Sequence, residues 1–536
     1  MDILDSEKLI VELNYRNEIV DERERTDSFR WQKMLDLLPE TVVDKRTLQM
    51  LEIQDLFKAL DHTFTSVGSA RLFHSLVNPT QSIEHIHSKQ DSFCEIESND
   101  RLKNSLIEYL NVFKEGEDAV FKFLNAHMQP LFPYRDFSRA MAAIKTMLQA
   151  ARAIPQPETV YLDSLIKSIL SFSGSPANSI VSGPKYRTFG GIKAREEKSF
   201  FTPSLRFRPG RLSGGSIMPF LPGLYFGAAW FTGLMEPAMA ESLFLATSWM
   251  SIIGLLYGGL IKPMFDFESA VLPIRRRLLE SNRFVSAIEA VAAIDELLSF
   301  VAYSQAVPHP TYLPEVTNGG VHYFFAENLR NPIMAKYDKN FVANDVDLDA
   351  PRLSFITGPN SGGKTTYCKT IAQSQILGQI GAPIVASKAK MNMTDKLTYQ
   401  APAFDTLNDP EGRFGTELKD TRDIFYSVTP KSLAILDEIA EGTTAHEKMN
   451  FSVDIMNGLH AIGCNTLLVT HSAELVERFQ EMEKGQYLQV EFDGDKPTHR
   501  LIEGISQESH AYRVARKIGF ASEDIERYLK EKGYIA

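Results

Sequence analysis

The spacing of apolar residues divides the chain into a helical part and a part of mixed character. Residues 44–172 carry apolar side chains at intervals of three and four with few turn signals, which predicts long amphipathic helices. The same spacing predicts a further helix at 287–303. Beyond Pro308, short apolar runs of strand length alternate with helical segments, as in an α/β domain with a mostly parallel sheet. We therefore expect a helical domain followed by a C-terminal α/β domain.

The segment 212–262 interrupts the helical part. Its only charged residues before Lys262 are Glu236 and Glu241, in a chain that is 23% charged. The two glutamates lie at the junction of apolar stretches at 217–235 and 242–261, each roughly 30 Å long as a helix, which matches the hydrocarbon thickness of a bilayer. The pattern predicts a transmembrane helical hairpin. The alternative is a pair of buried helices in a soluble core, which two prolines near the start of the first stretch favour.

Basic residues flank this apolar segment on both sides. The stretch 183–215 carries eight basic and two acidic residues, and Lys262 and the arginine run 275–277 follow the hairpin. Because positively charged flanks stay in the cytoplasm, we expect a multi-pass protein of the cell membrane with both termini cytoplasmic. The basic stretch also suits anionic lipid or DNA phosphates, or it serves only as a topology signal.

Composition narrows the class of protein. A hydrophobic share of 44% is typical of globular chains and excludes disorder as the main state. Three scattered cysteines, Cys94, Cys368 and Cys464, exclude a disulfide framework and a cysteine-rich zinc site. The net charge of −11 argues against indiscriminate nucleic-acid binding, so any DNA contact must come from local basic patches.

The strongest chemical signal is the segment 358–365, GPNSGGKT, which fits the pattern G-x-x-x-x-G-K-[ST] between a strand-like and a helix-like run. The glycines allow backbone N–H groups to turn toward phosphates at a helix N-terminus. Lys364 would contact the β- and γ-phosphates, and the Thr365 hydroxyl would ligate Mg²⁺. The pattern predicts a nucleotide site. Its candidate residues are Gly358, Pro359, Asn360, Ser361, Gly362, Gly363, Lys364, Thr365 and Thr366.

Hydrolysis needs a group that orders the metal and a group that activates water. The apolar run 432–436 ends in Asp437 and Glu438. Asp437 suits the metal, and Glu438 suits the base that polarises the attacking water. A second apolar run leads to His471, which we expect to sense the γ-phosphate, although a histidine at a strand end can also be structural.

Together these motifs resemble the ATPase core of the MutS family of DNA mismatch-repair proteins. The matching segments are ITGPNSGGKTT (356–366), LDEIAEGTT (436–444) and LVTH (468–471). The helical stretch 46–72 resembles the family's core or lever domain. The resemblance implies an α/β P-loop ATPase of the ABC/MutS type with ATP and Mg²⁺, a homodimer, and DNA as a partner. It also implies that Phe341 contacts the adenine.

The chain departs from the family pattern in several places. Only 43 residues precede the lever-like region, which leaves no room for the mismatch-reading and connector domains. In the signature loop, best matched by 412–418, Gly412 replaces the serine that reaches the partner's γ-phosphate. That contact would then fall to the backbone, Arg413 or Thr416, although Arg413 can equally be a solvated cation. After Asp437-Glu438, the family's Gly-Arg becomes Ala440-Glu441.

We therefore expect a membrane-anchored ATPase that couples ATP binding and hydrolysis to lever rearrangement in a process related to mismatch repair. Two alternatives stay open: an ATPase that acts on a protein or membrane partner without DNA, and a nucleotide-gated scaffold with little turnover. The expected domains are an N-terminal helical extension (1–43), all-α core or lever helices (44–175), a basic linker (176–211), the transmembrane hairpin (212–262), a returning lever helix with a connector (263–325) and the ATPase domain (326–536).

Overall fold

The computed structural model forms two compact units, which we describe separately. Within the described residues, the first unit comprises 63–71 and 95–298, and the second comprises 42–62, 72–94 and 299–535. The expected helical extension at 1–43 lies almost entirely outside the described residues. The structure describes residues 42–128, 132–198, 201, 203–210, 220–401, 412–439, 444–494, 496–506 and 518–535.

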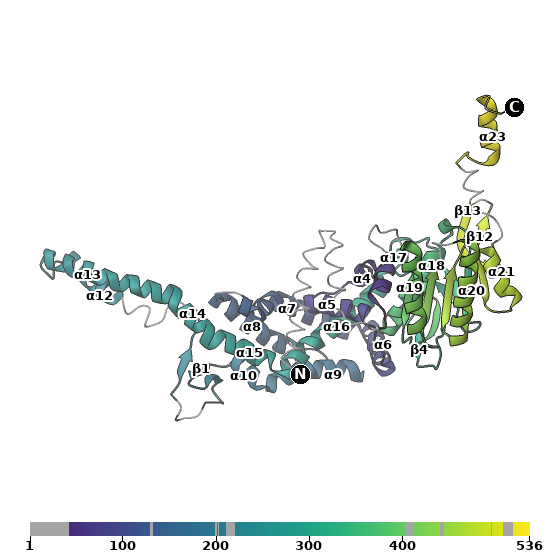
Figure 1. Ribbon diagram of the computed structural model, residues 1–536. Coiled ribbons are helices and arrows are strands. Elements are labelled where there is room, and N and C mark those ends of the chain that lie inside the picture. Colours follow the sequence, from purple (N-terminus) through teal and green to yellow (C-terminus); the bar gives the residue numbers. More distant parts are fainter. Residues whose placement is uncertain are drawn as a thin grey trace. The chain divides into compact units, whose positions relative to one another are not determined.

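The first unit consists mainly of helices (Figure 1), as the apolar spacing predicts. In α7, Leu102, Leu106 and Leu110 recur at four-residue intervals and are buried. The Asn99 side chain accepts a hydrogen bond from the backbone N–H of Leu102 at 3.1 Å and caps the start of the helix. Apart from the helices of the apolar segment, its α-helices are α7 (Asp100–Leu124), α8 (Tyr134–Ala151), α9 (Val160–Ser171), α10 (Pro176–Ser182), α15 (Leu272–Leu279) and parts of α5 (Ser66–Val77), α6 (Ile83–Ser98) and α16 (Asn282–Ala306).

Two buried carboxylates hold the N-terminus of α5. Asp295 accepts hydrogen bonds from the backbone N–H groups of Phe64 at 2.9 Å and Thr65 at 2.8 Å. Glu117 accepts from Ser66 and Val67, both at 2.8 Å. Burial raises the pKa of Asp295 to about 6, against the opposing effect of its hydrogen bonds. The helix start therefore binds two acidic groups in a water-poor environment.

A small antiparallel sheet lies where a basic linker was expected. It has the order β2-β1-β3, with β1 at Lys185–Thr188, β2 at Gly191–Ala194 and β3 at Leu205–Phe207. A two-residue turn joins β1 to β2, and Gly191 after it has a φ of 94°, which favours glycine. The segment 176–211 is thus a structured element, because these short strands pair with one another.

The apolar segment forms two helices of unequal length. The described part of α12 (Phe220–Phe231) has 12 residues, about 18 Å, which is shorter than the hydrocarbon layer of a bilayer. It ends because Gly233, with a φ of 67°, turns the chain and lets the N–H of Leu234 bond back to Ala229. The second helix begins with α13 (Pro237–Leu256) and runs on through η4 (Tyr257–Ile261), α14 (Lys262–Asp266) and η5 (Phe267–Val271) into α15.

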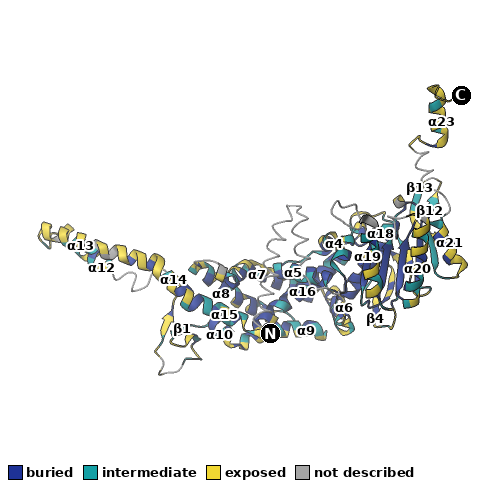
Figure 2. Cartoon of the chain, in the orientation of Figure 1, coloured by how far each residue is buried: buried dark blue, intermediate teal, exposed yellow. Residues whose placement is uncertain are grey.

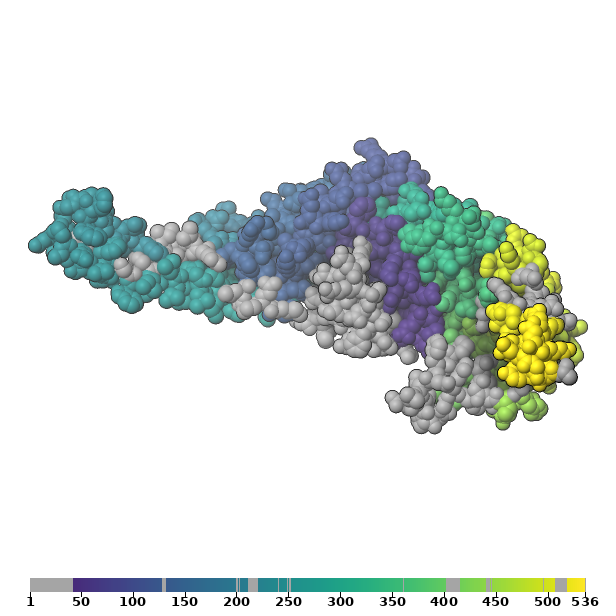
Figure 3. All heavy atoms as spheres, turned by 90° about the horizontal axis from the view of Figure 1, so that it is seen from above, coloured from purple at the N-terminus to yellow at the C-terminus, as the bar shows by residue number. Residues whose placement is uncertain are grey.

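The described residues therefore do not show the expected pair of membrane spans. Among the described residues, only the helical path Pro237–Leu279 is long and apolar enough to cross a membrane. Its large side chains are not core residues: Trp249 is 70% exposed and Leu255 is 63% exposed, and on α12 Phe231 is 94% exposed. Figure 2 shows α13 mostly and α12 partly in the exposed colour, and Figure 3 shows atoms of this segment, in teal, open on one face. The exposure of these side chains therefore contradicts the alternative prediction, a pair of buried helices in a soluble core.

The second unit contains a six-stranded sheet in which five neighbouring strands are parallel and β13 is antiparallel at one edge. This arrangement confirms the mixed α/β fold with a mostly parallel sheet. The order is β13 (Lys496–Glu503), β12 (Gln486–Asp493), β7 (Leu353–Thr357), β11 (Asn465–Val469), β10 (Leu433–Asp437) and β9 (Leu397–Gln400). The helices that follow its strands include α18 (Lys364–Gln379), α19 (Gly412–Ser427), α20 (Ala445–Ile462) and α21 (Ala473–Glu481).

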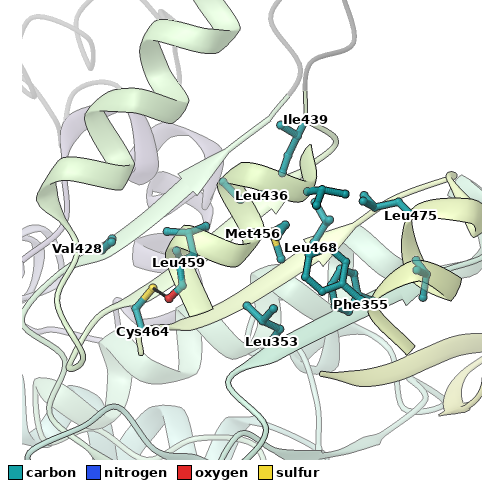
Figure 4. Packing of buried hydrophobic residues seen from close by; sticks show 14 residues of the cluster. Leu353, Phe355, Val428, Leu436, Ile439, Met456, Leu459, Cys464, Leu468 and Leu475 are labelled. Carbon is teal, nitrogen blue, oxygen red and sulfur yellow. Dashed lines mark hydrogen bonds between the residues drawn. The ribbon is translucent and has the colours of Figure 1, made fainter. Parts of the chain in front are cut away.

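The core of this unit lies against β7, β10 and β11. Parallel strands covered on both faces read as continuous apolar runs, and β7 and β11 are buried along their whole length. Phe355 lies with its ring centroid 5.0 Å from that of Phe479 on α21. Met456 of α20 packs between Leu436 and Leu468 in the same cluster (Figure 4). This packing fixes the ends of the strands, where the site lies.

The second unit also contains a smaller sheet and a helix near the C-terminus. A four-stranded sheet has the order β4 (Glu315–Thr317), β8 (Lys388–Asn392), β5 (Phe324–Leu329) and β6 (Asn344–Asp347), with α17 (Met334–Tyr337) after β5. The helix α23 (Ser522–Glu531) lies near the C-terminus.

The segment 42–62, expected in the helical domain, belongs to this unit. It contains α3 (Lys45–Met50) and α4 (Ile53–Leu60). The N–H of Leu397 donates to the carbonyl of Val42 at 2.8 Å, and the N–H of Tyr399 donates to Thr47 Oγ1 at 2.9 Å. The segment therefore supplies hydrogen-bond acceptors to the outer edge of β9, where backbone N–H groups would otherwise be unpaired.

Candidate active site

The glycine-rich loop connects β7 to α18. Gly358 has a φ of 121° and Gly363 a φ of 93°, in the region that favours glycine. At Gly362, an added Cβ would lie 2.5 Å from a methyl group of Val490 on β12. The loop therefore depends on glycine both for its backbone conformation and for its close approach to the neighbouring strand. Its turn η6 (Asn360–Gly362) leads directly into α18 at Lys364, as the motif predicts.

Lys364 folds back over the loop. Its side chain is buried, and Nζ donates to the carbonyl of Gly358 at 2.5 Å. Burial lowers the pKa of Lys364 to about 8, while the charges of Asp437 and Glu438 oppose the shift. Like these two carboxylates, a bound phosphate would favour the charged form of the Lys364 ammonium group.

The structure brings together the two predicted metal ligands. Thr365 Oγ1 donates to Asp437 Oδ2 at 3.0 Å, so a hydroxyl and a carboxylate oxygen meet at the loop. Oxygen ligands of this kind suit Mg²⁺, which usually keeps several water and phosphate ligands. Among the described residues there is no cluster of three or more His, Cys, Asp or Glu side chains that could hold a metal ion. The donor set therefore fits an ion that needs few protein ligands.

Glu438 and His471 also lie together. Glu438 has a φ of 66°, uncommon for a residue with a side chain, and its N–H donates to Val469 O at 2.9 Å. One carboxylate oxygen lies 3.7 Å from His471 Nε2, and the other lies 3.2 Å from Lys448 Nζ. Lys448, which α20 supplies ten positions after Glu438, belongs to none of the motifs predicted from the sequence. The carboxylate is thus placed by groups on two different elements.

Tyr399 is a second residue that the motifs did not reveal. It lies on β9, opposite Ile435 in the parallel register with β10, and is buried. Burial raises the pKa of the Asp437 carboxyl, while the hydrogen bond from Thr365, the charge of Lys364 and the nearby hydroxyl group of Tyr399 oppose that shift. Only the pairing of strands distant in sequence places Tyr399 beside the candidate metal ligand.

A cavity of about 370 Å³ opens beside the loop. Phe341 lies in its wall with the loop residues Ser361 and Gly363. The volume lies within the range of small-molecule pockets. His499 of β13 also lines it, held by a hydrogen bond from Asn344 Nδ2 to the His499 carbonyl at 3.1 Å. Phe341 is therefore placed where a base next to bound phosphates would lie.

The candidate signature loop is described only in part. Residues 412–418 form the first turns of α19, so this segment is helical. Thr416 on it is partly buried, whereas the side chain of Arg413 lies outside the described part of the chain. Ala440 and Glu441 are likewise outside it.

Comparison with known proteins identifies the domain. Residues 354–532 match the family model for MutS domain V. The chain is related to the MutS proteins. The DNA mismatch repair protein MutS of Desulforamulus reducens is 30% identical over 285 residues, 49% of this chain and 33% of that protein. MutS 2 of Halobacterium salinarum is 30% identical over 261 residues, 47% of this chain and 30% of that protein.

A longer similarity extends into the helical part. MutS of Caldanaerobacter subterraneus subsp. tengcongensis is 24% identical over 538 residues, which cover 90% of this chain and 60% of that protein. The chain thus spans about a third of the first two MutS relatives and more of the third. The expected resemblance to MutS is confirmed, and the glycine loop and both carboxylates lie within the matched domain V.

Proposed function

We propose that the second unit binds ATP with Mg²⁺ and hydrolyses it to ADP and phosphate. The observation that carries this proposal is the 3.0 Å pair of Thr365 and Asp437 at the mouth of a glycine loop, with Lys364 buried beneath it. The relationship to MutS domain V supports the same reading.

Each residue has a distinct task in this proposal. The loop N–H groups and Lys364 hold the β- and γ-phosphates, and Thr365 and Asp437 hold Mg²⁺. When bound, Mg²⁺ neutralises charge on the phosphates. Glu438 orients a water molecule for attack on the γ-phosphorus and accepts its proton as the bond to the ADP oxygen breaks. Lys448 and His471 fix the orientation of the Glu438 carboxylate.

Turnover and nucleotide binding of substituted chains test this assignment. Lys364→Ala should abolish ATP binding, because the phosphates lose their buried cation. Glu438→Gln should keep binding and slow hydrolysis by at least about 100-fold, the usual effect of losing a positioned base. Lys388→Ala and Glu481→Gln, at exposed positions, are matched controls. Equal turnover in the wild type and Glu438→Gln would refute the assignment.

We also propose that two copies share their sites. A glycine loop and one carboxylate pair leave one face of the γ-phosphate open. The resemblance to MutS suggests that residues 412–418 of a second copy cover it, through Arg413, Thr416 or the backbone at Gly412. A guanidinium there would offset charge that develops on the phosphate.

The similar proteins are named as DNA mismatch repair proteins, which suggests DNA as the partner of this ATPase. The exposed apolar hairpin favours a second candidate, a tethered ATPase that acts on a membrane or protein partner without DNA. Stimulation of ATP turnover by DNA duplexes, measured on the detergent-solubilised chain, distinguishes the two. A nucleotide-gated scaffold would bind ATP with negligible turnover under either condition.

We propose further that the hairpin α12–α13 inserts into the apolar layer of the cell membrane. Large exposed apolar side chains line both helices, and from Pro237 to Ile261 the helical path measures roughly 37 Å, enough for the hydrocarbon layer. The chain should then resist extraction with alkaline carbonate, and deletion of 212–262 should release it. A full-length chain that stays in solution without detergent would contradict insertion.

A further inference from the structure

The sheet β1–β3 presents a surface of unusual composition beside the hairpin. Phe189, in the turn between β1 and β2, is 95% exposed, and Leu205 on β3 is 67% exposed. The same sheet carries three exposed arginines, with Arg206 on β3 and with Arg195 and Arg208 just beyond the ends of β2 and β3. Of the two acidic residues that follow Arg195, Glu196 is exposed and Glu197 pairs with Arg277. Bulky apolar tips among cations suit a boundary between apolar and anionic surroundings better than they suit water.

A buried charge network fixes this sheet to the second helix of the hairpin. Asp266, which is 1% exposed, accepts hydrogen bonds from Arg187 of β1, from Lys262 Nζ at 2.7 Å and from Tyr134 at 2.5 Å. Lys262 Nζ also donates to the carbonyl of Gly210, just beyond β3, at 2.6 Å. These bonds join the sheet to one level of the helix, because a buried carboxylate strongly requires its partners.

That level is where the helix changes from apolar to charged. Met264 and Phe265 are the last of its exposed large apolar residues, and Lys262 is its first basic one. The guanidinium of Arg187 lies 5.0 Å from the centre of the Phe265 ring. If the apolar helix lies in hydrocarbon, the sheet therefore lies at the depth of the lipid headgroups.

We propose that the β1–β3 sheet binds the headgroups of anionic phospholipids, with the arginines against the phosphates and Phe189 and Leu205 among the acyl chains. The proposal rests on the insertion of the hairpin proposed above, and it adds a preference for lipid charge that insertion alone does not require. DNA phosphates would attract the same arginines but give no reason for the exposed apolar tips.

Vesicle binding of the full chain tests the preference. The detergent-solubilised chain is diluted into vesicles of phosphatidylcholine, alone or mixed with phosphatidylglycerol, and the bound fraction is measured by sedimentation at several salt concentrations. Phosphatidylglycerol should tighten binding by at least about tenfold, and salt should weaken the gain. The triple variant Arg195→Gln, Arg206→Gln and Arg208→Gln should lose most of this gain in affinity, because each lost charge weakens binding roughly fivefold.

A control of equal charge separates a local effect from net charge. Arg101→Gln, Lys145→Gln and Arg152→Gln remove three exposed basic residues from other helices of the unit and should leave the gain intact. In a Phe189→Trp variant, anionic vesicles should shift the added tryptophan emission to shorter wavelength, and neutral vesicles should shift it less.

The outcomes keep the two proposals apart. Equal binding to both vesicle types would overturn the headgroup site and leave insertion standing, whereas binding to neither would overturn both. Binding of a DNA duplex that the triple variant loses, without a preference for phosphatidylglycerol, would make the sheet a nucleic-acid surface and also overturn the headgroup site.

Discussion

At the scale of single residues, the side chains around the glycine loop fix one another's positions. Glu438 holds a left-handed backbone conformation that costs free energy, and the fixed end of β10 maintains it. Asp437, one position earlier, is held by Thr365 and lies beside Tyr399. Small changes at neighbours of the two carboxylates should therefore alter the chemistry without unfolding the unit.

Tyr399→Phe should raise the Mg²⁺ concentration needed for half-maximal turnover by about three- to tenfold, because the Asp437 carboxylate loses a neighbouring hydroxyl group that favours its charged form. Affinity for ATP without metal should stay unchanged, since the loop is untouched. Tyr426→Phe, at an exposed position on α19, serves as the control. An identical Mg²⁺ dependence in all three proteins would exclude a role for the Tyr399 hydroxyl.

Gly362→Ala should weaken nucleotide binding at least about tenfold, because the new methyl group would press on Val490 and displace the loop. Adding Val490→Ala should restore part of the affinity, since it removes the methyl groups in the way. Gly320→Ala, where an added Cβ meets nothing within 4 Å, is the control. Calorimetric titration with ATP measures all four, and failure of the double variant to recover would point to backbone conformation instead.

At the scale of elements, the N-terminus of α5 depends on two carboxylates that share one small volume. Asp295 has a raised pKa of about 6, chiefly because burial disfavours its charged form, and the nearby charge of Glu117 adds to the shift. A raised pKa in the folded state means that protonation stabilises folding. That contribution is complete below about pH 4 and is lost as the pH rises through about 6.

Asp295→Asn should remove this pH dependence. Between pH 4 and pH 6.5, the wild-type chain should lose on the order of 2 to 3 kcal/mol of unfolding free energy relative to the variant. Urea midpoints measured across this range in detergent provide the test, with the exposed Asp91→Asn as the reference. Parallel pH profiles for the wild type and Asp295→Asn would show that Asp295 does not titrate there.

How far sequence predicts the elements depends on how local their causes are. The loop 358–365 and the strands ending at Asp437 and before His471 were predictable, because a motif and an apolar run each fix their own backbone. Tyr399 and Lys448 were not, since strand register and helix packing bring them to the site. The short strands β1–β3 were not predicted, because a run of three or four residues carries little periodicity.

At the scale of the whole molecule, the proposed function requires two copies of the chain. Mixing Arg413→Ala with Glu438→Gln protein should then partly restore ATP turnover. In a mixed dimer, one site would carry both defects and the other neither, because Glu438 acts in its own subunit and Arg413 in the neighbour's. Turnover is measured over a series of mixing ratios, with each variant alone as the control. Activity equal to the sum of the separate variants at every ratio would rule out a trans role for Arg413.

The pairing of residues 42–62 with β9 also affects how the protein is made. Thr47 and Tyr399, joined by a hydrogen bond, are 352 positions apart. At a synthesis rate of about 5 to 20 residues per second, the early segment leaves the ribosome roughly 20 to 70 s before its strand. The apolar hairpin emerges during that interval. A nascent chain therefore holds an unpaired segment that a chaperone can protect, and a β9 edge produced without residues 42–62 would be open to aggregation.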